Sequence, residues 1–144
     1  MGNLKRNSSI IFILFMISLF IGCAKQAASY EPTIKDIALK TNSTDLEAIS
    51  KQVMVKAFDE YKKNSVTKEL RIEDYTINKI NDIQGNIERF SFSIDYSLKP
   101  SYINSYVLAG NGAVKDSWVI NKFAFVEVQK IDKEYKINSM GTGK

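Results

Sequence analysis

One stretch of this sequence has the apolar spacing of a helix. Apolar side chains recur every three or four residues, at Leu46, Ile49, Val53, Ala57 and Tyr61. This spacing predicts one amphipathic helix over residues 44–64 that packs by a single face. The run Thr44-Asp45-Leu46-Glu47 has the form of a capping box and predicts Thr44 as the N-cap.

From residue 69 onward the apolar period changes to two, which is typical of strands with one face in a core. The alternation that starts at Phe90 predicts a strand, and Pro100 is expected to end it. The preceding strand changes phase by one residue near Asp74, which predicts a β-bulge. Residues 82–86 are expected to join these two strands as a hairpin.

Further strands are expected over residues 105–109, 118–129 and 134–140, with turns at Gly110-Asn111-Gly112 and at residues 131–133. One helix followed by four or five antiparallel strands predicts an α+β domain whose helix packs on the concave face of a curved sheet. This order of elements resembles the cone-shaped cystatin-like and nuclear-transport-factor-2-like domains. That class holds enzymes and non-enzymatic binders alike, so the resemblance implies a fold and no activity.

The first 22 residues follow a different pattern. Lys5 and Arg6 precede a run over residues 10–21 in which only Ser18 is polar. As a helix this run would span about 18 Å, which is short of the ~30 Å hydrocarbon core of a bilayer. Its length and its one-sided positive charge predict a signal peptide.

The signal peptide is followed by Phe20-Ile21-Gly22-Cys23, which resembles the bacterial lipobox. The resemblance implies cleavage after Gly22 and two acyl chains on Cys23, which would anchor the chain stably on the extracytoplasmic face of the cell membrane. The expected organisation is a signal peptide over residues 1–22, a lipidated tether over 23–42 that docks partly, and an α+β domain over 43–144. A short helical turn after Pro32 is the alternative for the tether.

A second resemblance covers residues 69–143. It rests on turns and aromatic residues at Gly110-Asn111-Gly112, Trp118, Phe123, Phe125, Tyr135-Lys136-Ile137 and Gly141-Thr142-Gly143. This pattern is similar to uncharacterised lipoproteins of Gram-positive bacteria. The similarity implies a location and a fold and carries no catalytic residue.

Composition removes several classes of function. The 144 residues include one cysteine and no histidine, which excludes an internal disulfide and a zinc site built from Cys and His. Removal of Lys5 and Arg6 with the leader lowers the formal net charge from +4 to +2. The remaining charges alternate in sign, so no basic stripe for nucleic acid is expected. No catalytic residue, cofactor or metal site is expected, and the domain is predicted to be non-enzymatic.

Lys122 is the most informative polar candidate. It shares its parity with Trp118, Ile120 and Ala124 and is expected to point toward a largely apolar face. A lysine there is either the cation at the mouth of a ligand cavity between helix and sheet, or a structural side chain that extends past the core or guards an edge strand. The first alternative predicts a small or lipid-like ligand.

Aromatic residues outside the core supply the other candidates. Tyr102 and Tyr106 follow Pro100 and either form an interface or fold back over the rim of the sheet. Val119, Phe123 and Phe125 have the parity opposite to that of the core and are expected to be exposed. These residues favour a domain that contacts another envelope or secreted protein through one face of the sheet, with the ligand cavity as the alternative.

Overall fold

The computed structural model describes residues 33–65, 71–103 and 110–142. Its elements are a 3-10 turn η2 (Ile34–Asp36), the helix α2 (Leu46–Asn64), and the strands β1 (Ala38–Lys40), β2 (Ile72–Asn86), β3 (Arg89–Pro100), β4 (Ala113–Lys115), β5 (Trp118–Ile131) and β6 (Glu134–Gly141). Within these three ranges, no helix is both long enough and apolar enough to cross a membrane.

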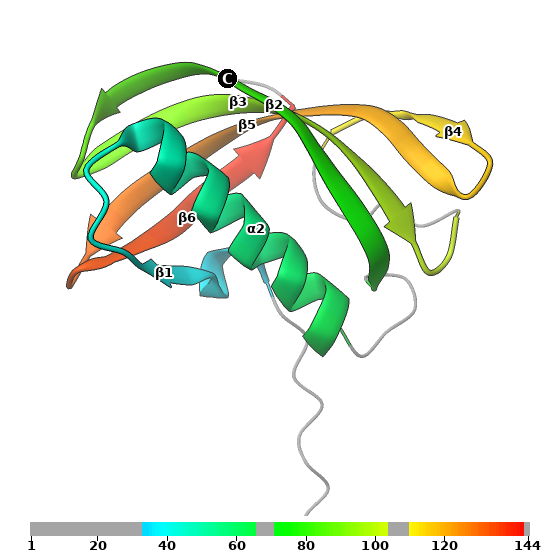
Figure 1. Cartoon of the computed structure of the whole chain (residues 1–144), viewed down its shortest axis with the longest axis horizontal. Helices are drawn as coiled ribbons and strands as arrows, with labels where there is room; N and C mark the ends of the chain where they lie inside the picture. The colour runs from blue at the N-terminus through cyan, green and yellow to red at the C-terminus, as the bar shows by residue number, and fades with distance from the viewer. Residues whose placement is uncertain (1–32, 66–70, 104–109, 143–144) are drawn as a thin grey trace, which may run out of the picture.

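The strands form one antiparallel sheet in the order β1-β6-β5-β3-β2, with β4 paired to β5. The sheet curls strongly, and α2 lies across its concave side (Figure 1). This confirms the predicted α+β class, in which a helix packs on a curved antiparallel sheet. Strands β1 and β4 are short and flank the long strands, so the described sheet has six strands where four or five were predicted.

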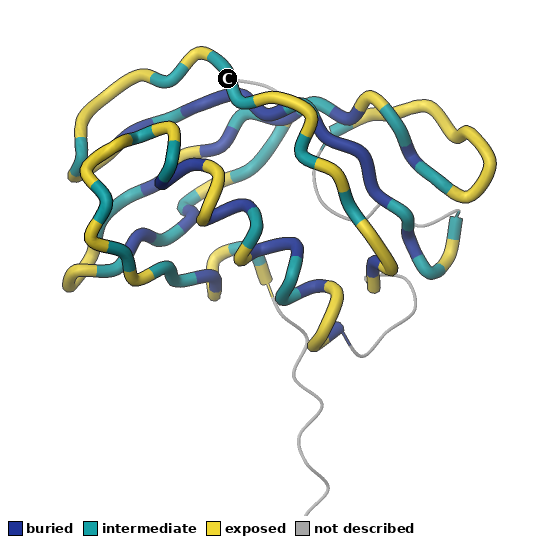
Figure 2. Tube along the Cα trace, in the orientation of Figure 1, coloured by how far each residue is buried: buried dark blue, intermediate teal, exposed yellow. Residues whose placement is uncertain are grey.

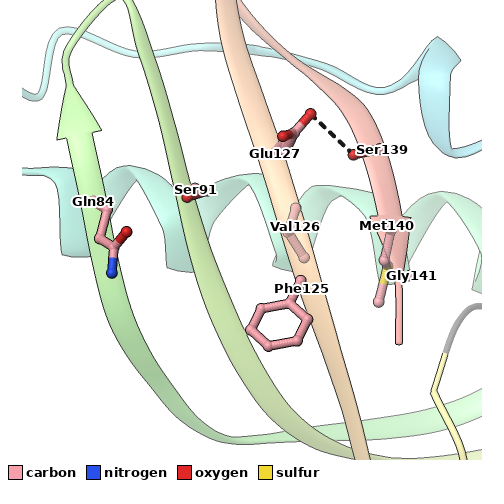
Figure 3. Close-up of a pocket in the computed structure, with 8 residues that line it drawn as sticks. All are labelled: Gln84, Ser91, Phe125, Val126, Glu127, Ser139, Met140 and Gly141. Carbon is pink, nitrogen blue, oxygen red and sulfur yellow. Dashed lines mark hydrogen bonds between the residues drawn. The ribbon is translucent and has the colours of Figure 1, made fainter. Parts of the chain in front are cut away.

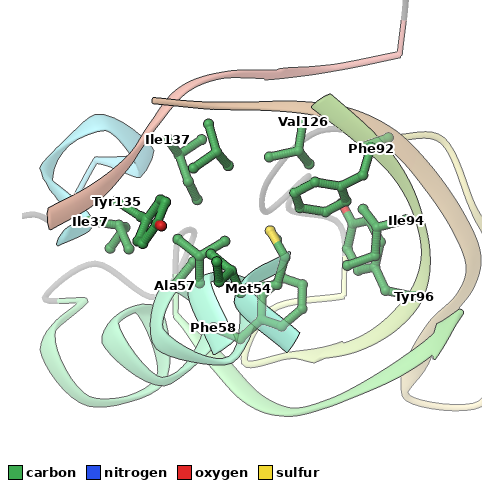
Figure 4. Close-up of a cluster of buried hydrophobic side chains, with 14 of the residues drawn as sticks. Ile37, Met54, Ala57, Phe58, Phe92, Ile94, Tyr96, Val126, Tyr135 and Ile137 are labelled. Carbon is green, nitrogen blue, oxygen red and sulfur yellow. The ribbon is translucent and has the colours of Figure 1, made fainter. Parts of the chain in front are cut away.

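The core lies between α2 and the concave side of the sheet. The buried positions of α2 lie on its side toward the sheet (Figure 2). Their side chains pack against inward-pointing side chains of β3, β5 and β6 (Figure 4). The central members of this core are Val53, Met54, Ala57, Phe58, Phe92, Ile94, Tyr96, Val126, Tyr135 and Ile137. The helical and strand periods of the sequence therefore identified the two halves of one core.

The helix is capped one residue later than predicted. Asp45, not Thr44, is the N-cap of α2, and its Oδ1 accepts a hydrogen bond from the Glu47 backbone amide at 3.0 Å. The Asp45 amide in turn donates to Ser43 Oγ at 3.2 Å, which fixes the approach of the chain. A carboxylate at this position also interacts favourably with the positive end of the helix dipole, which explains why Asp45 takes the place of a threonine.

The strand pair β2–β3 contains the predicted bulge, but its hairpin turn lies at other residues than predicted. Its register shifts between Ile72 and Asp74, which confirms the bulge expected at Asp74. Residues 82–86 are not the connection, because β2 continues through them with a register shift between Asn81 and Gln84, where Asp82 has a φ of 52°. The turn lies at residues 87–88, where Asn86 Oδ1 accepts from the backbone amides of Glu88 and Arg89 at 3.0 and 3.2 Å.

A bulge in β5 reverses the face of the sheet that was predicted for residues 118–120. Asn121 has a φ of 56°, and the pairing of β3 with β5 shifts register beside it. Val119, which was expected to be exposed, is therefore buried, while Trp118 and Ile120 are half-buried. The uniform alternation assumed for residues 118–128 is wrong on the N-terminal side of Asn121 because the extra residue reverses the face to which each side chain points.

The turns of the C-terminal half differ in part from the prediction. The expected turn at residues 131–133 is confirmed, with Asp132 and Lys133 both at positive φ. The hairpin turn before β5 lies at residues 116–117, whereas Gly110 passes so close to β5 that an added Cβ would lie 2.4 Å from the Phe123 carbonyl oxygen. The strand predicted over residues 105–109 lies outside the described residues.

The segment before the helix is part of the folded domain from Thr33 onward. The Thr33 amide and hydroxyl both donate to Asp36 Oδ2, at 3.0 and 2.7 Å, which holds the turn η2. Ile37 is buried in the core, and β1 pairs with β6 at the edge of the sheet. The structured domain thus includes ten residues that the sequence prediction assigned to the tether before residue 43.

Candidate functional site

The outer face of the sheet, on the side opposite α2, carries a mixed set of polar and aromatic side chains. Because successive strand residues point to opposite faces, the core positions of β3 and β5 alternate with outward positions. On the central strands the outward residues are Ser91, Ser93, Asp95, Phe123, Phe125 and Glu127. The helix covers only the inner face, so this outer face is where we searched first for a binding site.

A hollow of about 380 Å³ lies on this face, and we call it the outer-face hollow. It is lined by residues of four strands, namely Gln84, Ser91, Phe125, Val126, Glu127, Ser139, Met140 and Gly141 (Figure 3). A second hollow of about 130 Å³ adjoins it and shares Gln84, Ser91 and Glu127. The larger volume falls within the range of about 300–1,000 Å³ that is common for small-ligand sites.

Glu127 is the charged group of the outer-face hollow. Its Oε2 accepts a hydrogen bond from Ser139 Oγ at 3.2 Å and lies 3.9 Å from the Arg89 guanidinium. The cross-strand register sets both contacts, because Glu127 stands opposite Ser139 on β6 and next to Gln129, which pairs with Arg89 on β3. The carboxylate is therefore oriented by its neighbours on the sheet surface.

An aromatic pair continues the outer face next to Glu127. The rings of Phe123 and Phe125 lie 4.9 Å apart with an interplanar angle of 89°, which is an edge-to-face arrangement. Both side chains are half-buried. Of the three apolar residues proposed for an exposed patch, the structure thus places Phe123 and Phe125 on the outer face and Val119 in the interior.

Three pairs of opposite charge lie on and around the outer face. The pairs are Arg89–Glu127 at 3.9 Å, Lys99–Glu73 at 2.8 Å and Lys40–Glu134 at 3.4 Å. The hydrogen bond to Glu73 raises the pKa of Lys99, so this lysine keeps its charge over a wider pH range. Each of these three pairs has no net charge.

Lys122 lies on the inner face, and its ammonium group contacts other groups of the protein. Its side chain is 1% exposed, its Nζ donates to the Gly110 carbonyl oxygen at 2.6 Å, and the same atom lies 5.7 Å from the centroid of the Tyr96 ring. Burial lowers the pKa of Lys122. Gly112 packs against its stem so closely that an added Cβ would lie 2.8 Å from Lys122 Cγ. This geometry holds the segment that leads into β4.

The remaining predicted residues fall in different places. Tyr102 follows β3 and is 50% exposed, at the same end of the sheet as Val114 on β4, which is 63% exposed. Tyr106 lies outside the described residues, as do Gly22 and Cys23 of the lipobox-like sequence. Of these candidates, Tyr102 is thus exposed at the end of the sheet, whereas Lys122 is buried on the inner face.

Comparison with protein-family models, with curated proteins and with solved structures finds no match to this chain. Among the described residues, no group of three or more acidic or cysteine side chains is arranged to hold a metal ion. The case for function therefore rests on the geometry of the outer face and on the sequence of the leader.

Sequence reasoning missed most of the polar lining. Gln84, Ser91, Glu127 and Ser139 each read as an ordinary solvated position on its own strand. Only the register between strands brings them together, and because β2 has three register shifts against β3, positions along the sequence do not give the positions across the sheet. The available signal was the alternation on β3 and β5, which placed Ser91 and Phe125 on one face but not beside Gln84.

Proposed function

We propose that this chain is a lipid-anchored, non-enzymatic interaction domain that binds another component of the cell envelope through the outer face of its sheet. In this proposal residues 1–22 are a cleaved signal peptide, Cys23 carries the acyl chains, and the domain works on the extracytoplasmic face of the membrane. The folded part belongs to the cystatin-like type of α+β cone. An envelope or secreted protein is the partner class that the sequence predicts.

One observation carries the binding part of the proposal, namely the outer-face hollow beside the Phe123–Phe125 pair. The inner face is filled by α2 and the core, and Lys122 on that face bonds to a backbone carbonyl. A ligand between helix and sheet, the alternative function, would compete with this internal contact. The helix does not cover the outer face, which combines half-buried aromatic rings with oriented polar groups.

The anchor is tested by a Cys23→Ser variant of the full chain expressed in the host bacterium. A single thioether carries both acyl chains, so we expect the Cys23→Ser variant to lack the mass of the acyl groups. Variant chains whose leader is cleaved at another position should be in the soluble fraction, whereas uncleaved chains stay on the membrane through the leader. The measurement is membrane fractionation together with the intact mass of the protein. Ser29→Ala, in the same segment, should keep the acyl mass and fractionate like the parent, and a parent without the acyl mass would reject the anchor.

The binding face is tested by photocrosslinking in cells. A photoreactive amino acid replaces Gln84, at the outer-face hollow, or Gln52, an equally exposed glutamine on α2. We expect position 84 to give an adduct and position 52 to give none, because only the first faces the proposed surface. A protein partner gives a discrete band, and a polysaccharide gives a broad distribution of high-mass adducts. Mass spectrometry then identifies the adduct. Adducts of equal yield at both positions, or none at either, would contradict a binding function for the outer face.

A further inference from the structure

We infer that the outer-face hollow binds a neutral saccharide chain, and that the envelope component it recognises is a neutral stretch of cell-wall polysaccharide. This inference rests on the proposed function, because it names the ligand of the same face. The argument comes from the chemistry of the lining, from its charge and from its extent across the sheet.

The lining matches the two kinds of surface on a sugar ring. A pyranose presents C–H groups on its faces and hydroxyl groups around its rim. The electron-rich face of an aromatic ring attracts such C–H groups, and Phe125 supplies an aromatic ring to the lining of the hollow. Figure 3 shows Phe125 between Gln84 of β2 and Met140 and Gly141 of β6, with Glu127 nearby on its own strand. A sugar stacked there has polar groups around its rim.

The polar groups of the hollow have hydrogen-bonding capacity left over. Among the described residues, the Gln84 amide and the Ser91 hydroxyl make no side-chain hydrogen bond, and both recorded contacts of Glu127 use Oε2 rather than Oε1. An amide, a hydroxyl and a carboxylate oxygen together offer donors and acceptors. A hydroxyl group also donates and accepts, so this set suits a polyhydroxylated ligand better than an apolar peptide side chain.

The charge of the hollow favours a ligand without charge. Glu127 is its single acidic residue, and the Arg89 guanidinium at 3.9 Å balances it. An anionic polymer would meet the Glu127 carboxylate, whereas a cationic segment would have to displace Arg89. A neutral ligand uses Glu127 as a hydrogen-bond acceptor, is not repelled by its carboxylate and does not displace Arg89.

The extent of the hollow favours a chain over a single sugar. Its lining comes from β2, β3, β5 and β6, which are neighbours across three inter-strand spacings, about 14 Å in total. The adjoining smaller hollow extends the same surface toward Arg89. Two connected hollows on one face are the arrangement that consecutive rings of an oligosaccharide would occupy.

The test is co-sedimentation of the full processed chain with insoluble cell-wall polysaccharide from the host bacterium. The polysaccharide is first stripped of protein and of anionic polymers, and the detergent has a head group that is not a sugar, so that it does not compete. We expect the parent to sediment and a soluble hydrolysate of the same polysaccharide to release it. Phe125→Ala should bind about fivefold more weakly, since a stacked ring contributes on the order of 1 kcal/mol.

Gln84→Ala is the second variant, because Gln84 is exposed and its removal leaves the fold intact. It should bind several-fold more weakly, whereas Gln129→Ala, at a residue of the same type on the same face but outside the hollow, should bind like the parent. Failure of the parent to sediment overturns the inference, and so does equal binding by the parent and the Gln84→Ala variant. If the polysaccharide fails and the photoadduct at position 84 is a protein, the saccharide is wrong while the interaction function stands.

Discussion

Lys122 shows how a single residue departs from the usual behaviour of its type. A lysine is rarely buried because its ammonium loses the hydration that stabilises the charge. Here a carbonyl oxygen at 2.6 Å and the face of the Tyr96 ring replace part of that hydration. They do not replace all of it, because burial still lowers the pKa of Lys122. The folded state therefore binds this proton less tightly than the unfolded chain does.

Replacing Lys122 with Met, which keeps an unbranched stem without the charge, should change how stability depends on pH. In the parent the free energy of unfolding should rise as the pH increases toward 10, because the unfolded lysine, with its ordinary pKa of 10.5, holds a proton that the folded one releases first. The Lys122→Met variant should lose this rise, as urea denaturation at several pH values would show.

The control for this measurement is Lys56→Met, at an exposed position on α2, which should keep the slope of the parent. The series stops at about pH 10 because Tyr75 acts in the opposite direction above that value. Burial, and to a smaller extent the hydrogen bond to Asp59, raises the pKa of Tyr75 from 10.0 to about 12. Through this residue the free energy of unfolding of the protein falls as the pH rises through that interval. Parallel slopes for the parent and Lys122→Met would show that the buried charge has no such effect.

At the scale of elements, periodicity predicted which segments are helix and strand, because each pattern reflects one buried face. The stripe beginning at Leu46 became α2, and the alternation beginning at Phe90 became β3. Bulges were harder. The phase change near Asp74 was visible because apolar residues lie on both sides of it, whereas the bulge at Asn121 was hidden within a run that is apolar at nearly every position. An almost uniformly apolar strand gives no phase to compare.

The candidate site could be predicted only in part for the same physical reason. Parity on β5 was enough to place Phe123 and Phe125 on the outer face, since no bulge separates them from the regular part of the strand. Glu127 and Ser139 come together through a cross-strand register that shifts immediately after them. Pairing between strands depends on tertiary packing and turn geometry, so the polar half of the hollow needed the structure.

At the scale of the whole molecule, the point where the fold begins decides how far the domain can move from an anchor. The described domain starts at Thr33, ten residues after Cys23. Ten residues of chain reach at most about 36 Å. With the acyl anchor that we propose, the domain would stay within that distance of the bilayer surface. This limit depends on whether the segment from Thr33 to β1 stays docked on the sheet.

Ile37 is the residue that docks this segment, because it is 2% exposed and belongs to the same core as α2. Ile37→Ala should lower the free energy of unfolding of the full chain by about 2–4 kcal/mol, the usual cost of emptying a buried aliphatic site. Lys35→Ala, at an exposed position two residues earlier, should change it by less than about 0.5 kcal/mol. Chemical denaturation measures both. A loss for Ile37→Ala as small as that for Lys35→Ala would mean that the segment is not part of the cooperative fold, and the tether would then extend to the start of α2 and roughly double its reach.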